Sequence, residues 1–536
     1  MTRSHPMSGA MGHKSDDFKT IKLNHKYMNI SVIYRKLILG LFFLPTLAFS
    51  SQKQINIADV GAKGDGQTDN TAIIQKAIDE ASESGNGKVI IPAGRFMTGV
   101  IQLKSNVELN LAGNAVLLGS AKRADYGPSN ASPLVVAKGQ HNISITGKGT
   151  IDGNGHELIR NIYEMLNTGT LQDSEWKTYN PWHQMRPEER NRPKILFIFG
   201  CDSVQVKGIT LKNGLCWIQD YRNSSNIIID SIRVDSRTFL NNDGIDVTDC
   251  KNVRITNCAI DAADDGICLK SSTRNLRCEN IYVANCSVRS SASALKLGTA
   301  SVGGFKHITI RDIKIHDTYR SAIAIESVDG GILEDVDVQN ITAKNTGNAI
   351  FIRLGYRNID SVYSKLQNVH IAHVHVEIPA TKPDKDYEEE GPPVYYPHNV
   401  FPSSITGIPG HPVENVTIED VEMVYEGGGS KDIAYFDWKK LDEVPEKETD
   451  YPEFSMFGEL PVWGFYVRHV SGLTMKDISL ETKKPDYRPA YGFDDVNGLR
   501  MSKINVSPEN AESQIILKAV SYGRLDSNLK YMKISD

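Results

Sequence analysis

Residues 241–272 read NNDGIDVTDCKNVRITNCAIDAADDGICLKSS, and this stretch decides the fold. It contains Asp-Gly-Ile twice, and the two aspartates, Asp243 and Asp265, are 22 residues apart. If 22 residues make one structural repeat, the two carboxylates stack one above the other, with Asp264 beside them. Crowded carboxylates raise one another's pKa, and carboxyl groups with different pKa values are what acid–base chemistry requires. The stretch therefore predicts both a repeating fold and a reactive site.

An apolar template extends the repeat along the chain. Apolar residues recur at positions i, i+2, i+5 and i+7 in ten copies, which begin at Val204, Ile227, Val253, Ile281, Ile308, Val336, Val369, Val416, Leu473 and Leu499. Each copy holds two period-two runs with a one-residue phase change, which predicts strand, bend and strand rather than helix. The copies predict an all-β solenoid of parallel strands, in which each coil buries its apolar face against its neighbours. A β-sandwich is the alternative, but sandwich strands do not keep one four-position template.

A second pattern runs through the same coils in another phase. Five polar residues each stand two positions before an apolar pair: Asp243, Asp265, Ser293, Ser321 and Asn348. Five positions after three of these markers come Lys270, Glu326 and Arg353. The pattern predicts two polar ladders on one long face of the solenoid. An extended polymer would lie along such a face.

Composition narrows the class of protein. The chain has 536 residues, 40% of them hydrophobic, and a net charge of −5, which does not support nucleic acid as a partner. A solenoid can absorb most of this length as one domain, so we expect a single domain over residues 51–536. The Gly/Asp-rich loop at 59–71 lacks the Gly-Lys-Ser/Thr end of a phosphate-binding loop. We interpret it as a turn into a helix over about 71–82 that caps the solenoid, and we expect no cofactor and no metal.

The first 50 residues are predicted to lie outside this domain. Residues 28–50 have the form of a secretory signal: basic residues, an apolar run from Leu37 to Phe49, and a cleavage site after Ser50. The run is too short to span a membrane. We therefore expect a secreted or periplasmic protein with no membrane association after cleavage. The 27 residues before Met28 are unusual for a signal, and we treat them as an upstream extension.

The seven cysteines and three long inserts complete the prediction. Cys258 and Cys286 hold the same template position in adjacent copies, so we expect buried thiols rather than disulfides. The inserts lie near 155–192, 380–411 and 427–464 and are rich in aromatic residues. Inserts of this size often form the walls of sites, and aromatic rings pack against sugar faces.

These motifs resemble the family 28 glycoside hydrolases, the polygalacturonase group. The resemblance covers roughly residues 54–375 and rests on three segments: Asp59-Val60-Gly61-Ala62-Lys63-Gly64-Asp65-Gly66, then Asn241-Asn242-Asp243 for the family's Asn-Thr-Asp, then Asp264-Asp265 for its paired aspartates. It implies a right-handed, single-stranded parallel β-helix that hydrolyses galacturonan or rhamnogalacturonan with inversion. The partner would be a polysaccharide or oligosaccharide, and we expect a monomer.

Two departures from the family concern the substrate. The family's Gly-His-Gly falls on Ala292-Ser293-Ala294, and its Arg-x-Lys falls on Arg353-Leu354-Gly355. Both the histidine and the lysine are therefore missing. Lys270, Lys296 and Arg357 are candidates to replace the lost positive charge. The contacts to a sugar carboxylate would then differ from those of the family.

The resemblance also implies roles for individual residues. Asp264 would be the general acid, and Asp243 and Asp265 would activate water. The residues alone leave open which aspartate keeps the proton, because coupled carboxylates titrate as a group. The predicted substrate-binding residues are Asn241, Lys270, Ser293, Lys296, Arg353 and Arg357. For Arg353 the alternative is an ion pair with Glu326, one coil away in the same phase.

Three other functions would use the same fold. A polysaccharide lyase would use clustered aspartates to hold calcium. A carbohydrate-binding protein without catalysis would explain the missing histidine. A sugar epimerase is a more distant alternative. Chelator sensitivity and unsaturated products would distinguish the lyase from a hydrolase.

Overall fold

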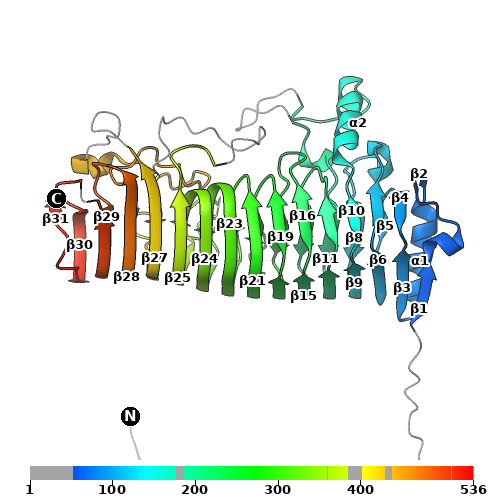
Figure 1. The fold of residues 1–536 in the computed structure, drawn as a ribbon, viewed down its shortest axis with the longest axis horizontal. Coiled ribbons are helices and arrows are strands. Elements are labelled where there is room, and N and C mark those ends of the chain that lie inside the picture. Colours follow the sequence, from blue (N-terminus) through cyan, green and yellow to red (C-terminus); the bar gives the residue numbers. More distant parts are fainter. Residues whose placement is uncertain are drawn as a thin grey trace, which may run out of the picture. The chain divides into compact units, whose positions relative to one another are not determined.

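The computed structural model describes residues 52–176, 186–358, 360–383, 401–428, 438–508 and 510–534. Strands of successive coils pair in parallel along the whole described chain (Figure 1). The apolar template aligns position by position: Val204 pairs with Ile227, Ile227 with Val253, and Val253 with Ile281, and the same register continues through the tenth copy. The fold is the predicted right-handed parallel β-helix.

Three parallel sheets form the walls of the N-terminal coils. The first comprises β1 (Lys53–Asn56), β3 (Gly87–Ile91), β6 (Val107–Leu111), β9 (His141–Gly147), β12 (Asp202–Lys207), β15 (Ser225–Asp230) and β18 (Lys251–Thr256). The second comprises β2 (Asp65–Asp69), β4 (Gly94–Thr98), β7 (Ala115–Gly119), β10 (Thr150–Asp152), β13 (Thr210–Lys212), β16 (Arg233–Ser236) and β19 (Ala259–Ala262). The third comprises β5 (Ile101–Gln102), β8 (Val135–Lys138), β11 (Leu196–Phe199), β14 (Gln219–Arg222), β17 (Ile245–Thr248), β20 (Ile267–Ser271) and β22 (Leu295–Ser301).

Later coils run around the bends as longer continuous strands. These are β21 (Cys278–Ser290), β23 (Gly304–Ser327), β24 (Ile332–Leu354), β25 (Lys365–Ile378), β27 (Val413–Gly427), β28 (Phe465–Lys484), β29 (Tyr491–Ser507), β30 (Ile515–Arg524) and β31 (Tyr531–Ile534), with the short β26 (Ser403–Thr406) between β24 and β28. Asn, Asp and His residues with positive φ, such as Asn285, Asp312 and Asn340, stand at their bends. Short polar side chains tolerate this left-handed conformation best.

The third sheet carries the second predicted pattern. Ile245 pairs with Ile267, Ile267 with Leu295, and Leu295 with Ile323, and Ile323 then pairs with Ile350. The polar markers that precede these residues therefore lie on successive coils. One edge of the third sheet thus holds a ladder of polar residues, as the spacing predicts.

The first end of the β-helix is closed by α1 (Thr71–Glu83). Its buried residues are Ile74, Ala77, Ile78 and Ala81, spaced three and four apart, and they pack on the open first coils. A cap of this kind shields the apolar end of a solenoid from water.

The first insert contains a helix that the repeat pattern does not predict. α2 (Gly155–Asn167) buries Leu158, Ile162 and Leu166, which lie four residues apart on one helical face. It rises from the body beside β10 in Figure 1. Short 3₁₀ helices complete the fold: η1 (Ile57–Val60), η2 (Arg123–Tyr126), η3 (Glu189–Asn191) and η4 (Trp438–Glu443).

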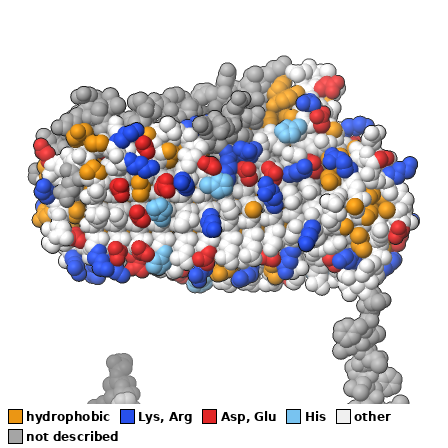
Figure 2. All heavy atoms as spheres, in the orientation of Figure 1, with side chains coloured by type: hydrophobic (Ala, Val, Ile, Leu, Met, Phe, Trp, Pro, Cys, Tyr) orange, Lys and Arg blue, Asp and Glu red, His pale blue; other side chains and the backbone are white. Residues whose placement is uncertain are grey.

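The remaining expectations concern cysteines, surface and membrane. All seven cysteines are buried free thiols, as predicted. The face in Figure 2 mixes acidic and basic side chains, in keeping with the small net charge. Residues 51–536 group into one compact unit. Among the described residues, no helix has the length and apolarity to cross a membrane, and the predicted signal at 28–50 lies outside them.

Candidate active site

The polar edge of the third sheet borders a pocket of about 360 Å³. Its lining includes four carboxylates, from Glu189, Asp243, Asp264 and Asp265. Five cations also line it: Arg186, Lys270, Lys296, Arg320 and Arg357. Two large aromatic side chains, Trp217 and Tyr451, also line the pocket. The three aspartates singled out by their spacing therefore share one pocket.

The glycine after each aspartate is required by close contact between coils. The amide of Gly244 donates to the carbonyl of Asp265 at 2.9 Å, and the amide of Gly266 donates to that of Ser293 at 2.8 Å. A Cβ on Gly244 would lie 2.5 Å from the carbonyl oxygen of Gly266. Real Cβ atoms do not approach so closely, so the Asp-Gly pair allows the coils to stack and holds each aspartate at the edge.

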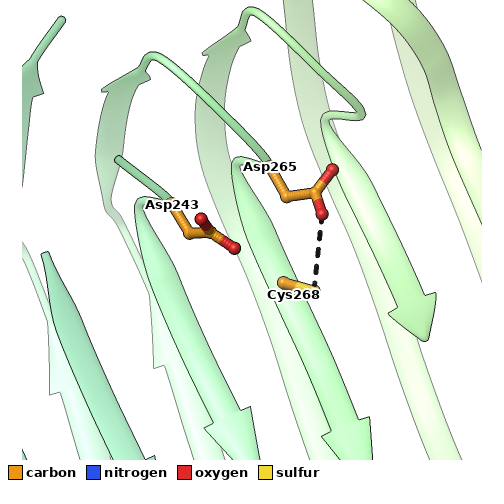
Figure 3. A group of neighbouring side chains, drawn as sticks. All are labelled: Asp243, Asp265 and Cys268. Atoms are coloured by element: carbon orange, nitrogen blue, oxygen red, sulfur yellow. Dashed lines mark hydrogen bonds between the residues drawn. The ribbon is translucent and has the colours of Figure 1, made fainter. Parts of the chain in front are cut away.

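Asp243 and Asp265 lie on adjacent coils and extend toward the same space (Figure 3). One carboxylate oxygen of each, together with the sulfur of Cys268, lies within 4.8 Å of the others. The amide of Asp265 donates to Oδ1 of the preceding Asp264 at 2.9 Å. The three carboxyl groups are therefore close enough to influence one another's protonation.

Two lysines neutralise part of this negative charge. The Nζ of Lys270 lies 2.9 Å from Oδ2 of Asp243 and also contacts Oδ1 of Asp246. The Nζ of Lys296 lies 3.1 Å from Oδ2 of Asp265. Both lysines are buried, at 8% and 2% exposed. They come from β20 and β22, whose outward-facing positions border the pocket.

The surroundings push the pKa values of the aspartates in different directions. Burial and then the neighbouring Asp265 raise the pKa of Asp264. Burial, together with Asp246, also raises the pKa of Asp243 well above its usual value, against the effect of Lys270. Burial works in the same direction on Asp265, but Lys296, Lys270 and Arg320 outweigh it and hold the pKa of Asp265 below its usual value. The pocket therefore holds one carboxylate that stays ionised beside two that retain protons more readily.

Asn241 lines the pocket, but protein groups occupy its side-chain oxygen. That oxygen accepts from Nη1 of Arg186 at 2.9 Å and from Nη2 of Arg192 at 3.0 Å. Ser293 contacts Asp265 through its backbone amide, which donates to Oδ1 at 3.1 Å. Ser293 is buried and is not part of the pocket lining. Ser293 thus supports Asp265 from behind the pocket, whereas Asn241 lines the pocket with its oxygen held by two arginines.

Lys296 and Arg357 meet at a residue of the third insert. The Nζ of Lys296 donates to Oη of Tyr451 at 3.3 Å. The guanidinium carbon of Arg357 lies 5.6 Å from the centre of the Tyr451 ring, and Asp329 accepts from its Nε and Nη2 at 3.0 and 2.9 Å. The third insert thus forms one wall of the pocket, while Arg186 and Glu189 from the first insert form part of another.

The structure does not bring Arg353 to the pocket. Its side chain is 1% exposed, and it donates to the backbone carbonyls of Gly407, Glu446 and Lys447 at 2.7 to 3.0 Å. Among the described residues it makes no ion pair with Glu326, so the ladder alternative is not observed either. The third insert covers this rung of the ladder, and Arg353 holds the insert against the coil.

Besides Arg186 and Glu189 of the first insert, the pocket includes Tyr451, Arg320 and Trp217, which are not predicted as site residues from the sequence. Tyr451 lies in an insert without repeat pattern. Arg320 immediately precedes the ladder residue Ser321 and pairs with Glu453 of the same insert at 2.5 Å. Trp217 precedes β14 at the position that Asp243 holds before β17. The spacing of the ladder could have predicted Trp217 and Arg320 as site residues, because Trp217 stands at one of its rungs and Arg320 beside another.

Asp243, Asp265 and Cys268 are also the one group of potential metal ligands among the described residues. The fit to a divalent cation is poor. Lys270 and Lys296 already neutralise the two carboxylates. Burial raises the pKa of the Cys268 thiol well above its usual value, so it stays protonated and is a weak ligand.

A parallel β-helix with clustered carboxylates in a lateral pocket defines a class of carbohydrate-active proteins. The model for glycosyl hydrolases family 28 matches residues 82–388, and the chain belongs to this family. Two curated relatives are an exo-poly-alpha-D-galacturonosidase of Dickeya chrysanthemi, 27% identical over 357 residues, and a probable polygalacturonase of Vitis vinifera, 27% identical over 320 residues. These matches cover 57% and 56% of this chain and 57% of each relative, so the chain spans little more than half the length of these relatives.

Solved structures agree with this fold. An exopolygalacturonase from Thermotoga maritima is 25% identical, with a TM-score of 0.55, over 70% of this chain and 88% of its own. A family 28 exopolygalacturonase from Yersinia enterocolitica is 18% identical, with a TM-score of 0.57, over 85% of this chain and 78% of its own. The second likeness bears on the fold alone.

Proposed function

We propose that this protein is a glycoside hydrolase that cleaves an acidic, pectin-type glycan with inversion at the anomeric carbon. The observation that carries this proposal is the pocket in which Asp265 has a lowered pKa while Asp264 and Asp243 have raised ones. Inverting hydrolysis needs one protonated and one ionised carboxyl group on opposite sides of the bond.

Asp264 is the proposed general acid. Its raised pKa keeps a proton available for the leaving oxygen, and its side chain is the least buried of the three aspartates. A carboxylic acid that must be protonated near neutral pH needs such a shift.

Asp265 and Asp243 are proposed to hold and activate the water. Oxygens of the two carboxyl groups lie within 4.8 Å of each other. One water can bridge that gap with two hydrogen bonds of about 2.8 Å. Lys296 keeps Asp265 ionised, so Asp265 accepts the proton when the water attacks. Asp243, with its raised pKa, shares a proton with its neighbours and orients the water.

Positive charge in the pocket supports an acidic substrate. Five cations face four carboxylates there, although the whole chain has a net charge of −5. Lys296 and Arg357 are the proposed ligands of a sugar carboxylate, and Tyr451 lies between them. Asn241, Lys270 and Ser293 are proposed to position the aspartates. Because two relatives carry the names exo-poly-alpha-D-galacturonosidase and probable polygalacturonase, galacturonan is the first substrate to test.

The test is digestion of pectic and algal polysaccharides by the purified protein. We expect new reducing ends and full activity in the presence of chelator. Proton NMR should show that the anomer released first has the inverted configuration. Unsaturated products absorbing in the ultraviolet, together with loss of activity in chelator, would establish a lyase instead. Glycan binding without any reducing ends would establish a binding protein.

We also propose that the protein is exported as a monomer with one catalytic domain over residues 51–536. Export rests on the signal-like residues 28–50, and the domain rests on the compact unit that residues 51–536 form. N-terminal sequencing of the exported protein tests the cleavage after Ser50, and light scattering tests the oligomeric state.

A further inference from the structure

The ladder that carries the aspartates continues past them toward the first coils. Asp220 of β14 pairs with Asp246 of β17, and Leu196 of β11 pairs with Gln219 of β14. The same offsets place Trp217 one coil before Asp243, and Lys194 one coil before Trp217. The backbone bonds agree, since the amide of Ile218 donates to the carbonyl of Asp243 and the amide of Leu196 donates to that of Ile218. Lys194, Trp217, Asp243 and Asp265 are therefore successive rungs, about 4.8 Å apart.

Trp217 stands at the end of the pocket with cations around its ring. The Nζ atoms of Lys270 and Lys194 lie 3.7 and 4.1 Å from the ring centre, and the guanidinium carbon of Arg222 lies 5.1 Å from it. The ring is half-buried and lines the pocket beside Asp243. Cations on an aromatic face hold the ring in place.

Lys194 and Arg222 share one hydrogen-bonded carboxylate on this side of the pocket. The carboxylate of Asp220, which is fully buried, accepts from Nζ of Lys194 at 2.5 Å and from Nε of Arg222 at 2.9 Å. Both cations therefore share one hydrogen-bonded carboxylate, while Asp246 and Glu189 add negative charge around Arg222. Within the described part of the chain, Arg222 bonds through Nε alone, which leaves its Nη groups for another anion. The side chains of Lys194 and Arg222 are 19% and 33% exposed, so a ligand can reach them.

Aromatic surface continues along the same sheet. Phe197 of β11 lies 5.7 Å from Nζ of Lys194 and stacks on Phe199 at 6.0 Å between ring centres. Phe199 is 40% exposed, so its ring is accessible from the surface. The surface beyond Trp217 therefore combines aromatic rings with two accessible cations, the combination that suits an acidic sugar.

We propose that Lys194, Trp217 and Arg222 form a subsite for a further sugar unit that carries a carboxylate, on the first-coil side of the bond cleaved. Lys194 and Arg222 bind the carboxylate, and Trp217 contacts the apolar face of the ring. The subsite rests on the proposed function. It adds that a second acidic unit is recognised one to two coils, or about 5–10 Å, from Asp243.

The test compares acidic oligosaccharides with their carboxyl-reduced counterparts. In Lys194→Met and Arg222→Gln, the remaining cation still pairs with Asp220. We expect each variant to lose about tenfold in selectivity, the ratio of kcat/KM for the acidic over the reduced substrate, because a hydrogen bond to a charged group is removed. Trp217→Ala should weaken the binding of acidic and reduced substrates alike. The effect should be seen only with substrates long enough to reach the subsite.

Lys207→Met is the matched control, because Lys207 ends β12 in the first sheet, away from the pocket. Equal loss on acidic and reduced substrates, or an unchanged ratio, would overturn the subsite. If the wild-type protein cleaves no glycan, the proposed function fails, and calorimetry of acidic and reduced oligosaccharides then tests the subsite separately. Tighter binding of the acidic ligand by wild type than by Lys194→Met would support it, and equal binding would overturn it.

Discussion

The Nζ of Lys296 lies 3.1 Å from Oδ2 of Asp265, and this contact sets the charge of the proposed base. Lys296 belongs to the coil that follows Asp265, and its ammonium group also donates to Tyr451, 155 residues later in the chain. One buried lysine thus links the repeating core to an insert. It stabilises the ionised form of Asp265 in surroundings that favour the neutral form.

Lys296→Met should raise the pKa of Asp265, because its main stabilising cation is removed. The proposed base would then be ionised only at higher pH, so the acidic limb of the pH–kcat/KM profile should move to higher pH and activity near neutral pH should fall. Kinetics across the pH range check this. Lys306→Met is the control, since Lys306 pairs with Glu334 on another face. An unmoved acidic limb would show that Lys296 does not set the ionisation of the base.

Asp264→Asn should lower kcat by about 10²- to 10⁴-fold, because proton donation to the leaving group is lost. Binding of oligosaccharide should persist, and calorimetry measures it alongside kcat. Asp235→Asn is the control, because Asp235 lies half-exposed on β16 and pairs with Arg233. Activity retained in Asp264→Asn would remove this residue from the mechanism.

Glu326→Gln should change how stability depends on pH. Burial raises the pKa of Glu326 from 4.5 to about 7. Between these values the folded state holds a proton that the unfolded state lacks, so wild-type stability falls as pH rises, by at most about 1.4 kcal/mol per pH unit. Glutamine keeps an acceptor for Thr299 and removes the titration. Melting temperatures from pH 5 to 8 should therefore fall less steeply in the variant, and an identical slope would contradict the prediction.

Gly266→Ala should destabilise the fold. The new Cβ would meet Cγ1 of Val288 at 2.4 Å and the carbonyl oxygen of Ala294 at 2.7 Å. Overpacking of this kind costs about 1–3 kcal/mol, which urea unfolding can measure. Gly113→Ala serves as the comparison, because a Cβ there meets no atom within 4 Å. Equal stability of the two variants would contradict the stacking argument.

Arg353→Met should loosen the third insert and weaken substrate binding through Tyr451. Removing the guanidinium leaves the buried carbonyls of Gly407, Glu446 and Lys447 without their donor. We expect KM to rise more than kcat falls, and proteolysis of the insert to speed up. If the insert is cleaved no faster, Arg353 does not anchor it.

Much of this site follows from periodicity. The spacing of the template predicts which residues pair between coils, because a solenoid repeats its contacts with every turn. It places Asp243 above Asp265 and, read further back, it also places Lys194 and Trp217. The roles of the aspartates remain proposals, but their proximity is a direct consequence of the repeat.

The sequence by itself thus determined the β-helix, its capping helix and the ladder of aspartates, because all three depend on contacts between neighbouring coils. Tertiary structure alone decided which rungs stay open. An insert covers Arg353 and makes it an anchor, whereas the same insert brings Tyr451 and Glu453 beside Lys296 and Arg320. An insert has no period to place it, since its position depends on packing between residues distant in the chain.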